Sequence, residues 1–143
     1  MAESGADPTG ARIFNILRGE AAEVRPTPYG DVGTIFSGSG LELVWVRKHG
    51  EPIDQDWFSS DEVDLILVVS GLLRVEFEAP GQDDRVLGPG ELLILPAGQR
   101  CRAYRWPRDA AEATVFVAAY PAATGAGVHD HGDFSANSGE KVP

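Results

Sequence analysis

The chain has 143 residues, of which 43% are hydrophobic, 17 are glycine and 10 are proline. This composition suits one domain with a core and many turns, and it argues against a helical bundle. A formal net charge of −10 would repel nucleic acids and anionic membranes, so neither is an expected partner. The single cysteine excludes an intrachain disulfide, and no leader-like or 18-residue apolar segment occurs. We therefore expect a cytoplasmic protein.

The N-terminal part of the chain is expected to begin with a tail. Residues 1–10 are small and polar, which predicts a flexible segment. Residues 12–17 fit either a short strand or a helical turn. Residues 21–30 contain two prolines and are predicted to form a loop. The folded domain is predicted at residues 11–121, and residues 122–143 are predicted to form a second flexible tail.

The middle of the chain consists of short apolar segments separated by turn residues. Extended segments are expected at residues 32–36, 41–47, 63–70, 72–78, 92–95 and 113–120, with a turn at residues 79–85. Residues 72–78 alternate between apolar and charged side chains, which is the period of a strand with one wet side. Val44-Trp45-Val46 is apolar on both faces, which is typical of a strand covered on both sides. Strands at this spacing predict an all-β sandwich or barrel.

The segment GELLILPAGQRCRAYR, residues 90–105, predicts a strand, a tight corner and a second strand. Proline suits a strand end and glycine a positive φ, so Pro96 and Gly98 belong to the corner. The segment resembles the second motif of the cupin superfamily, G-x5-P-x-G-x2-H-x3-N. Gly90, Pro96 and Gly98 match, whereas Cys101 occupies the histidine position and Arg105 the asparagine position. The resemblance implies a cupin-type jelly-roll barrel (a double-stranded β-helix) in a single domain.

The first cupin motif, G-x5-H-x-H-x3or4-E-x6-G, is matched less completely. Gly71 fits its closing glycine, which puts Asp64 at the glutamate position, with Glu62 as a rival. Its histidine positions fall on either Trp57 and Ser59 or Phe58 and Ser60. Members of the family that bind a metal use three histidines and one glutamate. Asp64 and Cys101 supply only two good donors for a divalent transition metal, so the resemblance implies a cupin with no metal and no other cofactor.

Asp64 and Cys101 are the candidate catalytic residues. Asp64 interrupts an apolar strand, and a buried carboxylate requires a partner or a shifted pKa. Asp64 is either an acid or base in the pocket, a hydrogen-bond acceptor for a ligand, or a structural residue paired with backbone donors or with Arg105. Cys101 is either a nucleophile or proton donor or, as free cysteines usually are, a small buried hydrophobe. A nearby carboxylate would raise the pKa of the thiol, which disfavours a ready thiolate.

Arg105, Trp57 and Ser59 are the candidate residues for binding a substrate. Arg105 shares strand parity with Cys101, so it either looks inward toward Asp64 or an anionic ligand, or reaches solvent. Trp57 and Ser59 could line the mouth of the pocket. Alternatively, the aromatic ring of Trp57 belongs to the core or to an interface.

His129 and His131 form a separate His-x-His pattern in the predicted C-terminal tail. On a strand, two histidines at this spacing would point the same way, as in a metal site. In a flexible segment they would bind a metal adventitiously or remain solvated.

These features predict a metal-independent barrel that binds or senses a small organic ligand, anionic or aromatic. The alternative is a metal-free isomerase, cyclase or lyase in which Asp64 or Cys101 moves a proton, because one fold hosts many activities. A metal-dependent dioxygenase with atypical ligands is a further alternative. We also expect a homodimer, in which residues 41–46 form an apolar edge strand that the second copy covers.

Overall fold

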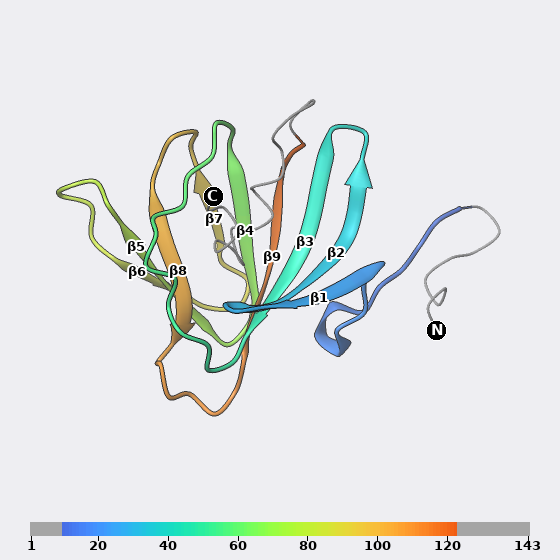
Figure 1. The fold of residues 1–143 in the computed structure, drawn as a ribbon, viewed down its shortest axis with the longest axis horizontal. Coiled ribbons are helices and arrows are strands. Elements are labelled where there is room, and N and C mark those ends of the chain that lie inside the picture. Colours follow the sequence, from blue (N-terminus) through green and yellow to red (C-terminus); the bar gives the residue numbers. More distant parts are fainter. Residues whose placement is uncertain (1–9, 123–143) are drawn as a thin grey trace.

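The structure is a computed structural model that describes residues 10–122. The flexible tails predicted at residues 1–10 and 122–143 lie almost wholly outside this range. Nine strands make up the described part (Figure 1): β1 Glu23–Thr27, β2 Gly30–Gly38, β3 Leu41–Lys48, β4 Asp64–Ser70, β5 Leu72–Phe77, β6 Arg85–Leu87, β7 Leu92–Leu95, β8 Cys101–Trp106 and β9 Thr114–Pro121. Among residues 10–122, no helix is long and apolar enough to cross a membrane.

The strands form two antiparallel sheets that face each other. The larger sheet has the order β1-β2-β3-β9-β4-β7, and the smaller has the order β6-β5-β8. In Figure 1 the smaller sheet lies to the left and the larger sheet curves from β7 and β4 to β2 on the right. Inward side chains of both sheets build one core, which includes Val46, Ile66, Leu73, Val75 and Phe116, all with exposed fractions of 0%. The predicted all-β, double-sheet barrel is confirmed.

The predicted loop at residues 21–30 is wrong, because Glu23–Thr27 forms strand β1. Pro26 pairs in register with Asp31 of β2. Because β1 is the edge of the sheet and pairs only with β2, a proline can be placed there without losing a central ladder hydrogen bond. At residues 12–17 the helical-turn alternative is the closer one, since Ile16–Arg18 forms a 3-10 turn.

The prediction that residues 41–46 form an edge strand is also wrong. These residues lie in β3, which is paired with β2 on one side and β9 on the other. The apolar edge of the larger sheet is β7 instead, where Leu92 and Ile94 have exposed fractions of 54% and 59%. The continuous apolar pattern of β3 reflects its central position. The homodimer itself stays a prediction.

Strand β3 is covered on both faces, as Val44-Trp45-Val46 predicted. Val46 points into the barrel, whereas Trp45 packs on the outside and is only 3% exposed. The indole Nε1 of Trp45 donates a hydrogen bond to the carbonyl oxygen of Glu20 at 2.8 Å. Gly33 lies directly opposite on β2, and a Cβ at this position would approach Cε2 of Trp45 to 2.2 Å. A glycine is therefore required where the ring lies flat on the neighbouring strand.

We expect Gly33→Ala to lower the free energy of unfolding by about 1–3 kcal/mol, because the added methyl group must displace the Trp45 ring. Urea unfolding of the wild type and the variant measures the effect. Gly88→Ala is the matched control, since a Cβ there meets the Leu72 side chain at 3.5 Å, an ordinary contact. Equal losses in the two variants would contradict the prediction.

Candidate functional site

The long connection between β3 and β4 runs beside β8 and closes that side of the barrel. Phe58 and Cys101 exchange two backbone hydrogen bonds, at 2.8 and 2.9 Å, in an isolated antiparallel bridge. Gly98 in the Pro96–Gly98 corner donates its N–H to the carbonyl oxygen of Ser60 at 2.8 Å. The corner that the sequence predicted therefore holds this connection in place.

Asp64 and Cys101 lie together in the sealed interior. Asp64 opens β4 and is 4% exposed, and Cys101 opens β8 and is 0% exposed. Burial raises the pKa of Asp64 to about 7, opposed by hydrogen bonding from the Ser60 side chain. Burial also raises the pKa of Cys101 to about 12, and the negative charge of Asp64 adds to this shift. Within residues 10–122, Oδ1 of Asp64 accepts no hydrogen bond.

The two candidate catalytic residues therefore differ in what they can do. With a pKa near 7, the Asp64 carboxyl exchanges a proton close to neutral pH, which suits an acid or a base. The Cys101 thiol stays protonated at neutral pH, and a buried thiol is a poor nucleophile. Its geometry matches the alternative of a small buried hydrophobe.

The structure selects one register for the two histidine positions of the first cupin motif. Phe58 packs against the core next to Cys101, and the side chain of Ser60 forms a hydrogen bond with the Asp64 carboxyl group. Phe58 and Ser60 therefore take the inward positions. Ser59 is exposed. Trp57 lies on the outer side, where the guanidinium carbon of Arg102 is 4.0 Å from the centre of its ring.

Trp57 belongs to a network on the outer face of the smaller sheet. Arg102 donates to Oε1 of Glu76 at 2.9 Å, and the Tyr104 hydroxyl donates to the other carboxylate oxygen of Glu76. Burial and this carboxylate raise the pKa of Tyr104 to about 12. These side chains pair mainly with one another, so they stabilise the outer surface and do not open into the barrel. Within residues 10–122, Nε of Arg102 has no hydrogen-bond partner.

Arg105 has the inward parity that the sequence predicted, since it pairs with the fully buried Leu73. Its guanidinium group donates hydrogen bonds to the carbonyl oxygens of Arg108 and Ala110. It forms no ion pair with Asp64, although both residues are within the described range. Arg105 thus holds the connection between β8 and β9, and its donors are engaged there.

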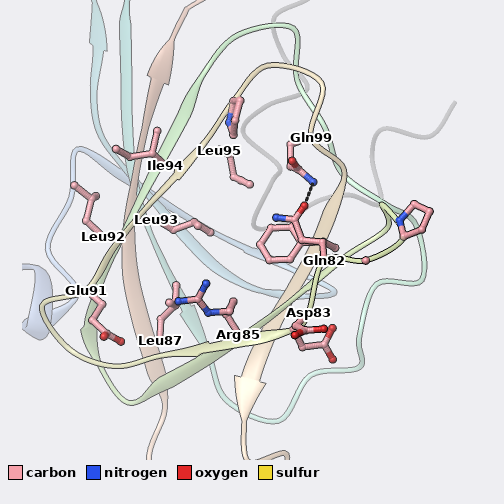
Figure 2. A pocket seen from close by; sticks show the side chains of 15 residues that line it. Gln82, Asp83, Arg85, Leu87, Glu91, Leu92, Leu93, Ile94, Leu95 and Gln99 are labelled. Atoms are coloured by element: carbon pink, nitrogen blue, oxygen red, sulfur yellow. Dashed lines mark hydrogen bonds between the residues drawn. The ribbon is translucent and has the colours of Figure 1, made fainter.

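A cavity of about 890 Å³ opens between the β5–β6 hairpin and β7 (Figure 2). Its apolar wall is formed by the side chains of Phe77, Leu87, Leu93 and Leu95. Charged and amide side chains surround the mouth: Gln82, Asp83, Asp84, Arg85, Glu91 and Gln99. The cavity exists because β6 and β7 are the free edges of the two sheets and do not pair with each other.

The cavity is lined by strand neighbours of Asp64 and Cys101, but not by Asp64 or Cys101 themselves. Leu95, which lines the cavity, is the register partner of Asp64 on β4. Phe77, which also lines it, is the register partner of Cys101 on β8. One layer of apolar side chains therefore separates the open cavity from the acid and the thiol.

The sequence reasoning missed Arg85 and Leu87 as cavity residues. Both belong to β6, a strand of three residues that begins at Arg85, so the predicted turn at residues 79–85 is wrong at its last residue. Arg85 pairs with Val75, and Leu87 pairs with Leu73. The alternation of residues 72–78 shows which side chains of β5 point inward. Only the register between β5 and β6 shows that Arg85 lies on the same inner face of the sheet.

Lys48 is a further buried ionisable residue, and the sequence did not predict a role for it. It is 7% exposed and shares inward parity with Val44 and Val46. Its ammonium group donates to the carbonyl oxygen of Tyr29 at 2.8 Å. Burial lowers its pKa to about 8. Lys48 pairs with Thr114 at the end of the barrel opposite Asp64, so it does not join the candidate catalytic pair.

The residues at the usual cupin metal position do not fit a transition metal. Such an ion requires several imidazole, thiolate or carboxylate donors, and this position offers Asp64, Cys101, Phe58 and Ser60. Within residues 10–122 there is no group of three or more His, Cys, Asp or Glu residues that could hold a metal ion. His129 and His131 lie outside the described residues.

Asp64→Asn is expected to change how stability depends on pH. The folded pKa of about 7 exceeds the ordinary value of 3.8, so between these values the folded state binds more protons than the unfolded state. The wild type should therefore lose stability as the pH rises through this window, and the variant should lack this loss. Urea unfolding at several pH values between about 4 and 8 tests this. The exposed Asp61→Asn is the control, and a wild-type profile in Asp64→Asn would contradict the assignment.

Neither a comparison with protein-family models nor one with curated protein sequences gives a match. Solved structures do match. A provisionally assigned mannose-6-phosphate isomerase from Ralstonia eutropha is 26% identical, with a TM-score of 0.57 over 71% of this chain and 94% of that chain. KdgF from a Halomonas species is 21% identical, with a TM-score of 0.55 over 71% of this chain and 89% of that chain.

A cupin-2 domain protein from Shewanella frigidimarina is also similar in structure. It is 18% identical, with a TM-score of 0.52 over 76% of this chain and 94% of that chain. These likenesses agree with the two facing antiparallel sheets. The chain therefore has the single-domain β-barrel fold of the cupin superfamily.

Proposed function

We propose that this protein binds a small organic ligand in the cavity between the β5–β6 hairpin and β7, without a metal ion. The observation that carries the proposal is the cavity itself, an opening of about 890 Å³ with an apolar wall and polar groups at its mouth. Ligand sites in proteins commonly enclose about 300–1,000 Å³ and combine apolar walls with a few polar groups. In this proposal the protein carries or senses the ligand and does not convert it into a product.

The cavity differs from the set of binding residues predicted from the sequence. Trp57 and Ser59 lie away from it, and the donors of Arg105 are engaged by backbone carbonyls. The proposed contacts are instead Leu93 and Leu95 from β7 and Phe77 and Leu87 from the β5–β6 hairpin. Binding would bury these side chains, which supplies the favourable free energy of the hydrophobic effect.

A variant that fills the cavity tests the proposal. Leu93→Trp places a larger ring against the cavity wall and is expected to abolish binding of small aromatic probes detected by ligand-observed NMR. Val86→Trp is the matched control, because Val86 points outward from the same hairpin and does not line the cavity. Binding that survives Leu93→Trp, in a variant with a cooperative unfolding transition, would contradict the proposed site.

The metal-free part of the proposal is tested by elemental analysis of the purified protein. We expect less than one equivalent of Fe, Mn, Ni, Cu or Zn per chain, because Asp64 and Cys101 are the only good donors that residues 10–122 place at the usual metal position. The metal content should not fall in Asp64→Ala or Cys101→Ala. One tightly held equivalent that either substitution removes would contradict this expectation.

A metal-free isomerase is the second candidate function, and the raised pKa of Asp64 favours it. A carboxyl group that titrates near pH 7 is suited to move a proton in either direction. One similar structure is provisionally assigned as a mannose-6-phosphate isomerase, which supports a search among sugar substrates. The reacting atoms would have to pass Leu95 or Phe77 to reach Asp64.

Asp64→Asn separates the two candidate functions. In a binding protein the variant should retain affinity for the ligand, and no product should form with either protein. In an isomerase the variant should bind the substrate and lose turnover, since an amide cannot exchange the proton.

A further inference from the structure

We propose that Arg85 makes the cavity selective for small organic anions, in particular carboxylates with an apolar carbon body. This inference rests on the proposed function, because it names the class of ligand that the same cavity takes. It adds a specificity-determining residue that lies away from Asp64 and Cys101.

Arg85 points into the barrel. It is the first residue of β6 and pairs with Val75 of β5, while Leu87 pairs with Leu73. Directly opposed residues of antiparallel strands share a face of the sheet, and Val75 and Leu73 are both fully buried in the core. Arg85 therefore lies on the inner face. Figure 2 shows its guanidinium group beside Leu87, at the mouth of the cavity that both residues line.

The other charged groups at the cavity are engaged or lie at its rim. Asp84 forms an ion pair with Arg74 at 2.7 Å, and Glu91 accepts a hydrogen bond from the N–H of Gly88 at 2.7 Å. Asp83 belongs to the hairpin turn before β6 and lies at the edge of the cavity in Figure 2. Arg85 is exposed, and its guanidinium group forms no hydrogen bond or ion pair with residues 10–122. Its donors are therefore available to a ligand.

The surroundings of Arg85 fit an amphipathic anion. A guanidinium group presents donors in a fixed fork that matches the two oxygens of a carboxylate. The nearby leucine side chains and Phe77 would cover the carbon body of the ligand. Gln82 and Gln99, whose amide groups lie 3.4 Å apart, offer donors and acceptors at the opposite side.

Three probes that share one ring and differ in charge test the inference: benzoate, benzamide and benzylamine. We expect benzoate to bind roughly 10- to 100-fold more tightly than benzamide, the range for a hydrogen bond to a charged partner. Arg85→Gln should reduce benzoate to the affinity of benzamide. Arg85→Lys should retain part of the preference, because it keeps the charge and loses the fork. Arg47→Gln, an exposed substitution on β3, is the matched control and should change nothing.

The outcomes separate this inference from the proposed function. If benzamide or benzylamine binds as tightly as benzoate, or if folded Arg85→Gln keeps the preference, the inference fails and the cavity site stands. If no probe binds, or if benzoate binds equally well to Leu93→Trp, the proposed function fails together with the inference. Affinities from NMR titration are read beside thermal unfolding curves, so that loss of binding is assigned only to folded variants.

Discussion

Two backbone hydrogen bonds between Phe58 and Cys101 determine how the interior of the barrel is divided. They attach the connection between β3 and β4 to the outer edge of β8, and this closes one side of the barrel. The corner at Gly98 adds a third hydrogen bond, to Ser60. A different register of this connection would turn Trp57 inward and Phe58 outward, because neighbouring residues of an extended segment face opposite ways.

The closed and the open side of the barrel have different chemistry. On the closed side, Asp64 and Cys101 are shielded from water, so both pKa values rise and the thiol stays protonated at neutral pH. On the open side, the free edges of β6 and β7 leave a cavity that solvent reaches. The position of the usual cupin metal site belongs to the closed side. The cavity that we propose as a ligand site belongs to the open side.

Two inward arginines show how tertiary contacts determine whether the donors of a side chain are engaged. Arg85 and Arg105 both have inward parity on the smaller sheet. Arg105 is followed by a loop whose carbonyl oxygens accept its hydrogen bonds, so it stabilises that loop. Arg85 follows a hairpin turn and faces the gap between the two sheets, where no described residue accepts its hydrogen bonds. The arginine on β8 therefore stabilises a loop, whereas the arginine on β6 has its guanidinium donors unoccupied by residues 10–122.

The all-β class, most strand positions and the corner at Pro96 and Gly98 could be predicted from the sequence, because these features depend on local alternation and on the backbone preferences of single residues. It also predicted the approach of Asp64 to Cys101 through the cupin resemblance. The strand pairings of the folded chain were needed to show that Phe58 and Ser60 point inward, that β3 is central and β1 is an edge strand, and that Arg85 faces the cavity. These features depend on pairings between residues far apart in the chain, which local patterns do not specify.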